Sequence, residues 1–302
     1  GFLTTSDPRI NRLYLNAKWS QKDNFLDLPT DCPQRDERMG WTGDAQVFCR
    51  TANLNFDCKR FFEKWLRDLA LAQYPDGGVP RVIPNVTYED PNGSVEKMER
   101  RHSAAWGDAA TVCPYECYVS YGDLDFLREC FPSMKAWVDY IGRYSVDHVW
   151  KIGFHYGDWL AMDAGEDSYV GATSTDLIAS AFFAWSTEMI IRAGKVLGED
   201  VSEYEALYAN VRKAFREYFM ENGMPKEEFP LTEVTRIEHA PVDTVRRGVT
   251  QTAITLILYI GLYEENEEKA NEYFSITIIF GIFLSIVAFL IIVLFEEPLF
   301  RF

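Results

Sequence analysis

The stretch richest in chemically active side chains is residues 31–44, which combines carboxylates, arginines and a tryptophan. A proline and two glycines interrupt regular structure on both sides of Glu37, so a constrained, irregular loop is expected there. A helical apolar pattern begins near residue 42, and a loop that leads into a helix can direct several side chains at one point. Binding and catalytic groups concentrate on such loops. The alternative is a solvated, salt-bridged surface loop, since most charged side chains are exposed.

Two further regions carry a similar mixture of acidic, aromatic and turn-forming residues. One comprises residues 76–84 together with 102–108, and the other comprises residues 153–163. Between these regions hydrophobic residues recur at helical spacing, and no convincing alternating strand is found. A polar connector is expected over residues 221–245. The pattern predicts helices over residues 8–22, 57–74, 103–121, 124–144, 173–197, 201–220 and 246–263.

The order of helices and loops predicts an all-α fold. The chemically active loops fall at every second junction between helices. An array of helical hairpins with these loops gathered at one end explains that spacing, and it is the organisation of an (α/α) barrel or toroid. The loops would then form one site.

Composition and charge restrict the class of function. The chain has 302 residues, 47% hydrophobic and 25% charged, which is typical of a folded globular protein of one large or two small domains. Its net charge of −16 argues against nucleic acid as a partner. The six cysteines and four histidines form no zinc signature, so neither a metal nor a cofactor is expected. The absence of a disulfide pattern favours a reducing, cytoplasmic location.

The last part of the chain has a different character. The sequence from Phe274 to Phe295 carries no charged side chain, and about 20 apolar residues suffice for a helix to span a bilayer. A membrane-associated segment is therefore expected, with a buried core helix as the alternative. The predicted division is a helical domain over residues 1–272 and a hydrophobic C-terminal helix within residues 273–302.

Several longer motifs follow one another along the chain. They read NFLDLPTDCPQRDERMGWTGDAQ at residues 24–46, FFEKWLRD at 61–68, DGGVP at 76–80, AWGDA at 105–109, PSMKAW at 132–137 and GDWL at 157–160. This order of motifs resembles the bacterial α-L-rhamnosidases of glycoside hydrolase family 78. The resemblance extends from about residue 1 to about residue 271.

The resemblance implies an (α/α)6 barrel and inverting hydrolysis of terminal α-L-rhamnosides. It implies that Glu37 is the general acid, and that the partner is a rhamnose-containing glycoside or oligosaccharide. Such chemistry needs one protonated carboxyl and one ionised carboxylate. Neighbouring acids would raise the pKa of Glu37 and neighbouring arginines would lower it, and the sequence leaves that balance open. The residues implied to hold the sugar or wall its pocket are Asp31, Arg35, Trp41, Asp44, Trp106, Asp158 and Trp159.

The sequence departs from the family in its later part. The family's general base is a glutamate beyond the point where the match ends, and roughly eight of the twelve barrel helices are found. The expectation is a truncated or mis-joined domain whose own hydrolytic activity is very low. Asp158 and Asp163 are the candidates for a substitute base, although no sequence pattern places either one beside the water.

Two other functions remain as alternatives. One is a catalytically inactive, membrane-tethered module that binds rhamnosides through Asp31, Asp44 and the tryptophans. The other is a helical scaffold in which the acidic loop is only a cluster of salt bridges. A downstream helical segment with a glutamate in the parent gene would favour the enzyme. Stable expression in membranes would favour the binding module, and no sugar binding at all would leave the scaffold.

Overall fold

The computed structural model of the protein describes residues 1–86, 102–151, 153–164, 169–229 and 246–263. Over these residues the fold is helical, as predicted, and the strands β1 to β4 are two residues long each. The helices are α1 (Pro8–Asn24), α2 (Thr42–Asn55), α3 (Lys59–Ala72), α5 (Ala109–Tyr121), α6 (Leu124–Tyr144), α7 (Thr175–Leu197), α8 (Ser202–Phe219) and α9 (Gln251–Ile260).

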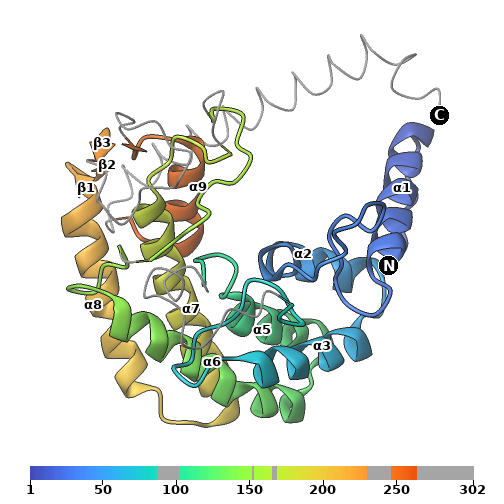
Figure 1. The fold of residues 1–302 in the computed structure, drawn as a ribbon, viewed down its shortest axis with the longest axis horizontal. Coiled ribbons are helices and arrows are strands. Elements are labelled where there is room, and N and C mark those ends of the chain that lie inside the picture. Colours follow the sequence, from blue (N-terminus) through green and yellow to red (C-terminus); the bar gives the residue numbers. More distant parts are fainter. Residues whose placement is uncertain (87–101, 152, 165–168, 230–245, 264–302) are drawn as a thin grey trace.

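The helices form an arc with an inner and an outer layer (Figure 1). On the inner side α2 contacts α5, α5 contacts α7, and α7 contacts α9. On the outer side α3 contacts α5 and α6, while α8 contacts α7. Helices α1 and α9 stand at the two ends of the arc. Inner and outer helices alternate along the chain, which is the hairpin arrangement predicted from the loop spacing.

Local signals fix several helix ends at the predicted positions. The carboxylate of Asp123 accepts a hydrogen bond from Phe126 N, so α6 begins at Leu124. The Ser174 hydroxyl accepts from Leu177 N at the start of α7. That helix ends at Gly198, whose φ of +76° is a left-handed conformation that glycine adopts without a Cβ penalty.

The core lies between the two layers. Its largest fully buried side chains include Trp65 of α3, Trp137 of α6, Phe183 of α7 and Phe215 of α8. Burying a phenylalanine side chain stabilises the fold by about 1.5–3 kcal/mol relative to leaving it exposed. Helix α7 is buried along most of its length and packs against α5, α6, α8 and α9. It is therefore the element that fixes the inner layer on which the loops stand.

Some predicted boundaries are wrong. The helix predicted from residue 103 starts only at Ala109, because residues 103–108 form turns that include Ala105 at a φ of +70°. The helix predicted over 246–263 contains β4 (Arg246–Arg247) before α9, which begins after its cap residue Thr250. Two-residue strands are too short to show alternation in sequence. For that reason the sequence predicted a connector without strands where the structure has most of β1 (Met220–Glu221), β2 (Met224–Pro225) and β3 (Glu228–Phe229).

Among the described residues, no helix combines the length and the apolar character needed to cross a membrane. The uncharged segment 274–295 and the predicted domain boundary at 272/273 lie outside the described residues.

Candidate active site

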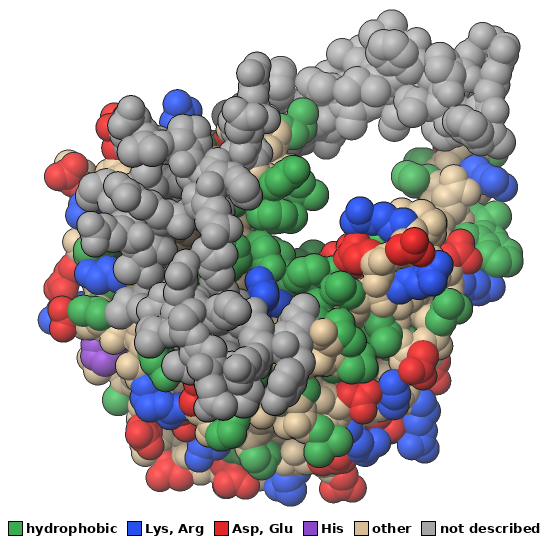
Figure 2. Space-filling model, in the orientation of Figure 1, with side chains coloured by type: hydrophobic (Ala, Val, Ile, Leu, Met, Phe, Trp, Pro, Cys, Tyr) green, Lys and Arg blue, Asp and Glu red, His purple; other side chains and the backbone are tan. Residues whose placement is uncertain are grey.

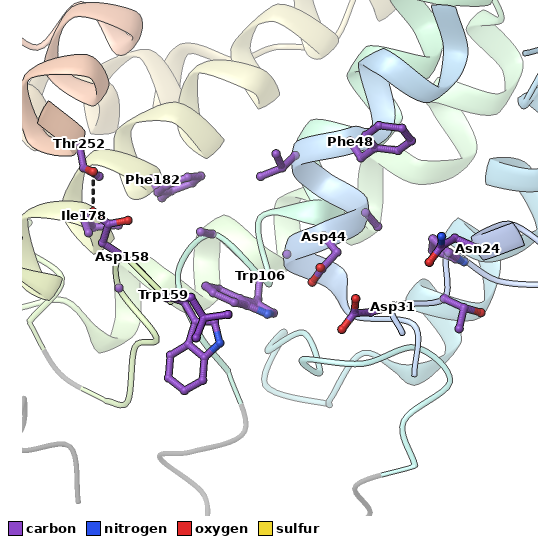
Figure 3. A pocket seen from close by; sticks show the side chains of 18 of the residues that line it. Asn24, Asp31, Asp44, Phe48, Trp106, Asp158, Trp159, Ile178, Phe182 and Thr252 are labelled. Atoms are coloured by element: carbon purple, nitrogen blue, oxygen red, sulfur yellow. Dashed lines mark hydrogen bonds between the residues drawn. The ribbon is translucent and has the colours of Figure 1, made fainter. Parts of the chain in front are cut away.

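A pocket opens on the inner side of the arc, where loops that precede inner helices meet (Figure 3). It encloses about 740 Å³, within the range of small-molecule sites. Five of the residues predicted for the site line it: Asp31, Asp44, Trp106, Asp158 and Trp159. Figure 2 shows hydrophobic side chains on the walls of the hollow and charged side chains at its edge.

The acidic loop is fixed by its backbone. Asp31 N donates to Met39 O at 2.9 Å, which closes the loop, and Ile83 N donates to Gly40 O at 2.9 Å. A Cβ on Gly40 would lie 2.3 Å from the Ile83 carbonyl oxygen, so only glycine permits this approach. Thr42 N donates to Arg81 O at 2.9 Å and ties the start of α2 to the same neighbouring segment. The loop is therefore held at both ends, as its proline and glycines predicted.

The other predicted site residues, Glu37, Arg35 and Trp41, are not part of the pocket lining, but a Glu37 carboxylate oxygen lies within 4.8 Å of a carboxylate oxygen of the lining residue Asp31. Both oxygens of Glu37 have partners. Trp41 Nε1 donates to Oε1, and Arg35 Nη2 lies 2.6 Å from Oε2. Burial raises the pKa of Glu37, but the hydrogen bonds from Trp41 and Cys32 and the charge of Arg35 outweigh it, so the pKa is lowered. The balance that the sequence left open therefore favours the ionised form in the free protein.

Asp31 and Asp44 form an acidic pair on the same side of the pocket as Glu37. Asp44 stands in the first turn of α2 and faces the open pocket, while Asp31 begins the acidic loop (Figure 3). Burial raises the pKa of Asp44 to about 6, and the negative charge of Asp31 adds to the rise. Asp44 can therefore donate a hydrogen bond in mildly acidic solution, where it is protonated, and only accept hydrogen bonds at higher pH, where it is ionised.

Asp158 lies across the pocket from Asp31 and Asp44 (Figure 3). Its Oδ2 accepts hydrogen bonds from Thr252 Oγ1 at 2.5 Å and from Thr173 Oγ1 at 3.4 Å. Thr252 belongs to the first turn of α9, so this contact joins the loop before α7 to the far end of the arc. Asp163 is exposed, its carboxylate accepts from Ala172 N, and it is not part of the pocket lining.

Aromatic rings form the wall between the pair Asp31 and Asp44 on one side and Asp158 on the other. Trp106 stands against α2, where a Cβ on Gly43 would lie 2.7 Å from the indole ring. Trp159 is 39% exposed and lies at the mouth of the pocket. Tyr156 contacts both rings, with centroids 4.5 Å from Trp106 and 5.1 Å from Trp159. Trp41 is joined to the group through Tyr156, at 6.0 Å.

One group of side chains in this region could in principle hold a cation. Asp31, Cys32 and Glu37 place ligand atoms within 4.8 Å of one another. The guanidinium of Arg35 is hydrogen-bonded to the same Glu37 carboxylate, and a positive charge at that position opposes a metal ion. Hydrogen-bonding chemistry directed at a polar ligand fits these residues better.

The sequence and the fold match a known family. The family model of the bacterial α-L-rhamnosidase six-hairpin glycosidase domain matches residues 1–278. The chain belongs to this family. It is 38% identical to an α-L-rhamnosidase of Formosa agariphila over 275 residues, which are 90% of this chain and 26% of that protein. It is 36% identical to an α-L-rhamnosidase of Streptomyces avermitilis over 255 residues, 84% of this chain and 23% of the relative.

Solved α-L-rhamnosidase structures share the arrangement. The Streptomyces avermitilis enzyme, complexed with L-rhamnose, superposes with a TM-score of 0.70 at 33% identity over 89% of this chain and 23% of that chain. The Aspergillus terreus enzyme gives a TM-score of 0.74 at 32% identity over 90% of this chain and 29% of that chain. The chain thus spans about a quarter of the length of these relatives.

Besides Thr252, which lines the pocket and donates to Asp158, two residues that support the site were not predicted from the sequence. Tyr156 contacts the tryptophans named above. Asp108 is fully buried, and its carboxylate accepts hydrogen bonds from Ala105 N at 2.7 Å, Trp137 Nε1 at 3.0 Å and Ser186 Oγ at 2.5 Å. These bonds fix the turn that carries Trp106. Asp108 stands in the motif at 105–109, and that position was its only signal in the sequence.

Proposed function

We propose that this six-hairpin domain carries the sugar-binding and proton-donating part of an α-L-rhamnosidase active site. The substrate would be a glycoside or oligosaccharide with a terminal, non-reducing α-L-rhamnose. The observation that supports this most strongly is the pocket itself, in which Asp31 and Asp44 face Asp158 across an aromatic wall. Carboxylates suit sugar hydroxyls, and the indole rings suit the apolar face and methyl group of a 6-deoxy sugar.

Glu37 is the proposed general acid. In the reaction its protonated carboxyl gives a proton to the glycosidic oxygen while the bond from that oxygen to the anomeric carbon breaks. A water molecule attacks the opposite face of the sugar, so the anomeric configuration inverts. Because Arg35 and Trp41 lower the pKa of Glu37 in the free protein, the acid has to gain its proton when the glycoside displaces water from the carboxylate.

The general base is not assigned to the described residues. Asp158 is the lining carboxylate opposite the acidic pair, but two threonine hydroxyls already donate to its Oδ2. That oxygen therefore has less capacity left to accept a hydrogen bond from an attacking water molecule. We therefore propose that the chain alone hydrolyses rhamnosides very slowly, since losing one of two acid–base groups costs about 10²–10⁴-fold in rate.

Binding and turnover test the proposal separately. Isothermal titration calorimetry with L-rhamnose should show one site in the wild-type chain, and Asp31→Asn or Asp44→Asn should weaken it. Asp57→Asn, an acidic residue beside α3 and outside the pocket lining, is the matched control and should bind as the wild type does. Wild-type affinity in both site variants, or no binding by the wild type, would reject the pocket as the sugar site.

A sugar-binding module without hydrolysis is the second candidate function. The relatives named above are α-L-rhamnosidases and do not favour it; the observation that puts it to the test is the lowered pKa of Glu37, whose carboxylate accepts from Trp41 and Arg35. If the wild type and Glu37→Gln bind L-rhamnose and neither releases it from a glycoside above the uncatalysed rate, this candidate replaces the first.

A further inference from the structure

The ring of Tyr156 occupies a central position behind the pocket wall. Its centroid lies 4.5 Å from that of Trp106, 5.1 Å from Trp159 and 6.0 Å from Trp41. It thus contacts each of the three tryptophans predicted to wall the pocket. Tyr156 is only 9% exposed and is not part of the pocket lining, so it supports the wall from behind.

The hydroxyl of Tyr156 is fixed by a residue from another loop. Arg81 Nη1 donates to Tyr156 Oη at 2.7 Å, and the guanidinium carbon lies 5.7 Å from the centroid of the tyrosine ring. The backbone of Arg81 is itself anchored, because its carbonyl oxygen accepts from both N and Oγ1 of Thr42. Arg81 therefore connects Tyr156 to Thr42 at the beginning of α2, in the same first turn as Asp44.

Backbone contacts join the loop of Tyr156 to the turn of Trp106. Tyr156 N donates to Ser103 Oγ at 3.1 Å, and Ala104 N donates to His155 Nδ1 at 3.0 Å. The loops that carry Trp41, Trp106 and Trp159 hence meet at one tyrosine. Trp41 also donates a hydrogen bond to Glu37. The tyrosine ring therefore contacts an indole that is bonded to the proposed acid.

From this geometry we infer that Tyr156 is a positioning residue that sets the three tryptophans for sugar binding, and that Arg81 fixes Tyr156 through its hydroxyl. This inference rests on the proposed function for its effect on the sugar, while its structural part does not. Tyr156 would act on the ligand only through the tryptophans, and it takes no part in proton transfer.

The structural part is tested without a ligand. In protein labelled with 5-fluorotryptophan, the ¹⁹F signals of Trp41, Trp106 and Trp159 are assigned by single Trp→Phe variants. Tyr156→Phe keeps the ring and removes the bond to Arg81, and it should shift or broaden these three signals together. Trp137, which stacks on Tyr140, and Trp185, which packs against Phe182, should keep their signals. If the three signals remain as in the wild type, the inference is wrong.

A matched control separates positioning from general destabilisation. Tyr204 is buried, and its hydroxyl donates to Asp139 at 2.9 Å on the outer layer, so Tyr204→Phe also removes one buried hydroxyl from its partner. This variant should leave the three signals and the sugar affinity unchanged. Equal changes in both variants would overturn the inference.

The functional part is a change in affinity for L-rhamnose. Losing one hydrogen bond behind the wall should weaken binding by about 3- to 10-fold in Tyr156→Phe, and Arg81→Met should weaken it to the same extent. Tyr156→Leu removes the ring contacts as well and should weaken it further. Unchanged affinity in Tyr156→Phe, with shifted tryptophan signals, would limit Tyr156 to a structural role. If the wild type itself binds no L-rhamnose, the proposed function fails and the ¹⁹F spectra still decide the positioning of the tryptophans.

Discussion

Replacing Arg35 by methionine should raise the pKa of Glu37. The guanidinium Nη2 lies 2.6 Å from Glu37 Oε2, and it is one of the groups that hold this pKa below its usual range. Methionine keeps the length of the side chain and removes the charge and the donors. The ionised carboxylate then loses one stabilising partner while the bond from Trp41 remains.

The size of the effect follows from exposure. At 2.6 Å an unscreened pair in a dry interior would interact strongly, but the Arg35 side chain is 65% exposed and water screens it. Because water screens this exposed pair, its loss should raise the pKa of Glu37 only in part, while the hydrogen bond from Trp41 keeps the rest of the lowering. Because the folded-state pKa is lowered, the pair stabilises the fold above the unfolded pKa, and the stabilisation is lost as the pH falls through the folded pKa.

The measurement is a ¹³C NMR titration of the side-chain carboxyl carbons in glutamate-labelled protein, with the Glu37 signal assigned by Glu37→Gln. Arg38→Met is the matched control, because Arg38 lies on the same loop and pairs with the exposed Asp36 at 3.8 Å instead of with Glu37. An unchanged or lower Glu37 pKa in Arg35→Met, or an equal rise in the control, would refute the reasoning.

Three further predictions follow from other contacts. Gly43→Ala places a Cβ 2.7–2.9 Å from the Trp106 indole, so it should destabilise the fold by about 1–3 kcal/mol and weaken L-rhamnose binding, as checked by thermal melts and calorimetry. Burial raises the pKa of Asp108 to about 6, so folding stability should decrease as the pH rises from about 4 to about 6, and Asp108→Asn should reduce that slope, while the share due to Asp44 remains, in urea titrations at several pH values. Asp158→Asn should lower sugar affinity and leave the slow turnover of bound substrate nearly unchanged; a large loss of turnover at saturation would instead identify Asp158 as the base.

The sequence predicted the parts of the site that depend on local chemistry. The proline and glycines around Glu37 predicted a constrained loop, and Gly40 proves indispensable for the contact with Ile83. The hydrophobic period predicted the helices of the arc, with α6 at the expected residues. Errors occurred where a turn precedes a helix, as before Ala109, because a short turn and a first helical turn share the same apolar pattern.

Features that depend on distant contacts could not be read from the sequence. The direction of the Glu37 pKa depends on the positions of Arg35 and Trp41 relative to two carboxylate oxygens. The role of Tyr156 depends on rings from three loops and on Arg81, 75 residues away in the chain. Neither hydrophobic periodicity nor a sequence motif predicts such contacts, because they form only when the inner helices pack together.

The most direct test of the central claim, that Glu37 is the proton donor of a rhamnoside-cleaving site, compares two substrates in the wild type and Glu37→Gln. p-Nitrophenyl α-L-rhamnoside has a leaving group that needs little protonation, whereas methyl α-L-rhamnoside needs a full proton transfer. Azide is added as a nucleophile that attacks the anomeric carbon without needing a general base. The variant should lose about 10²–10⁴-fold in rate with the methyl glycoside and far less with the nitrophenyl glycoside, and the azide product should be the β-anomer. Equal losses with both substrates, or no loss with either, would contradict the central claim.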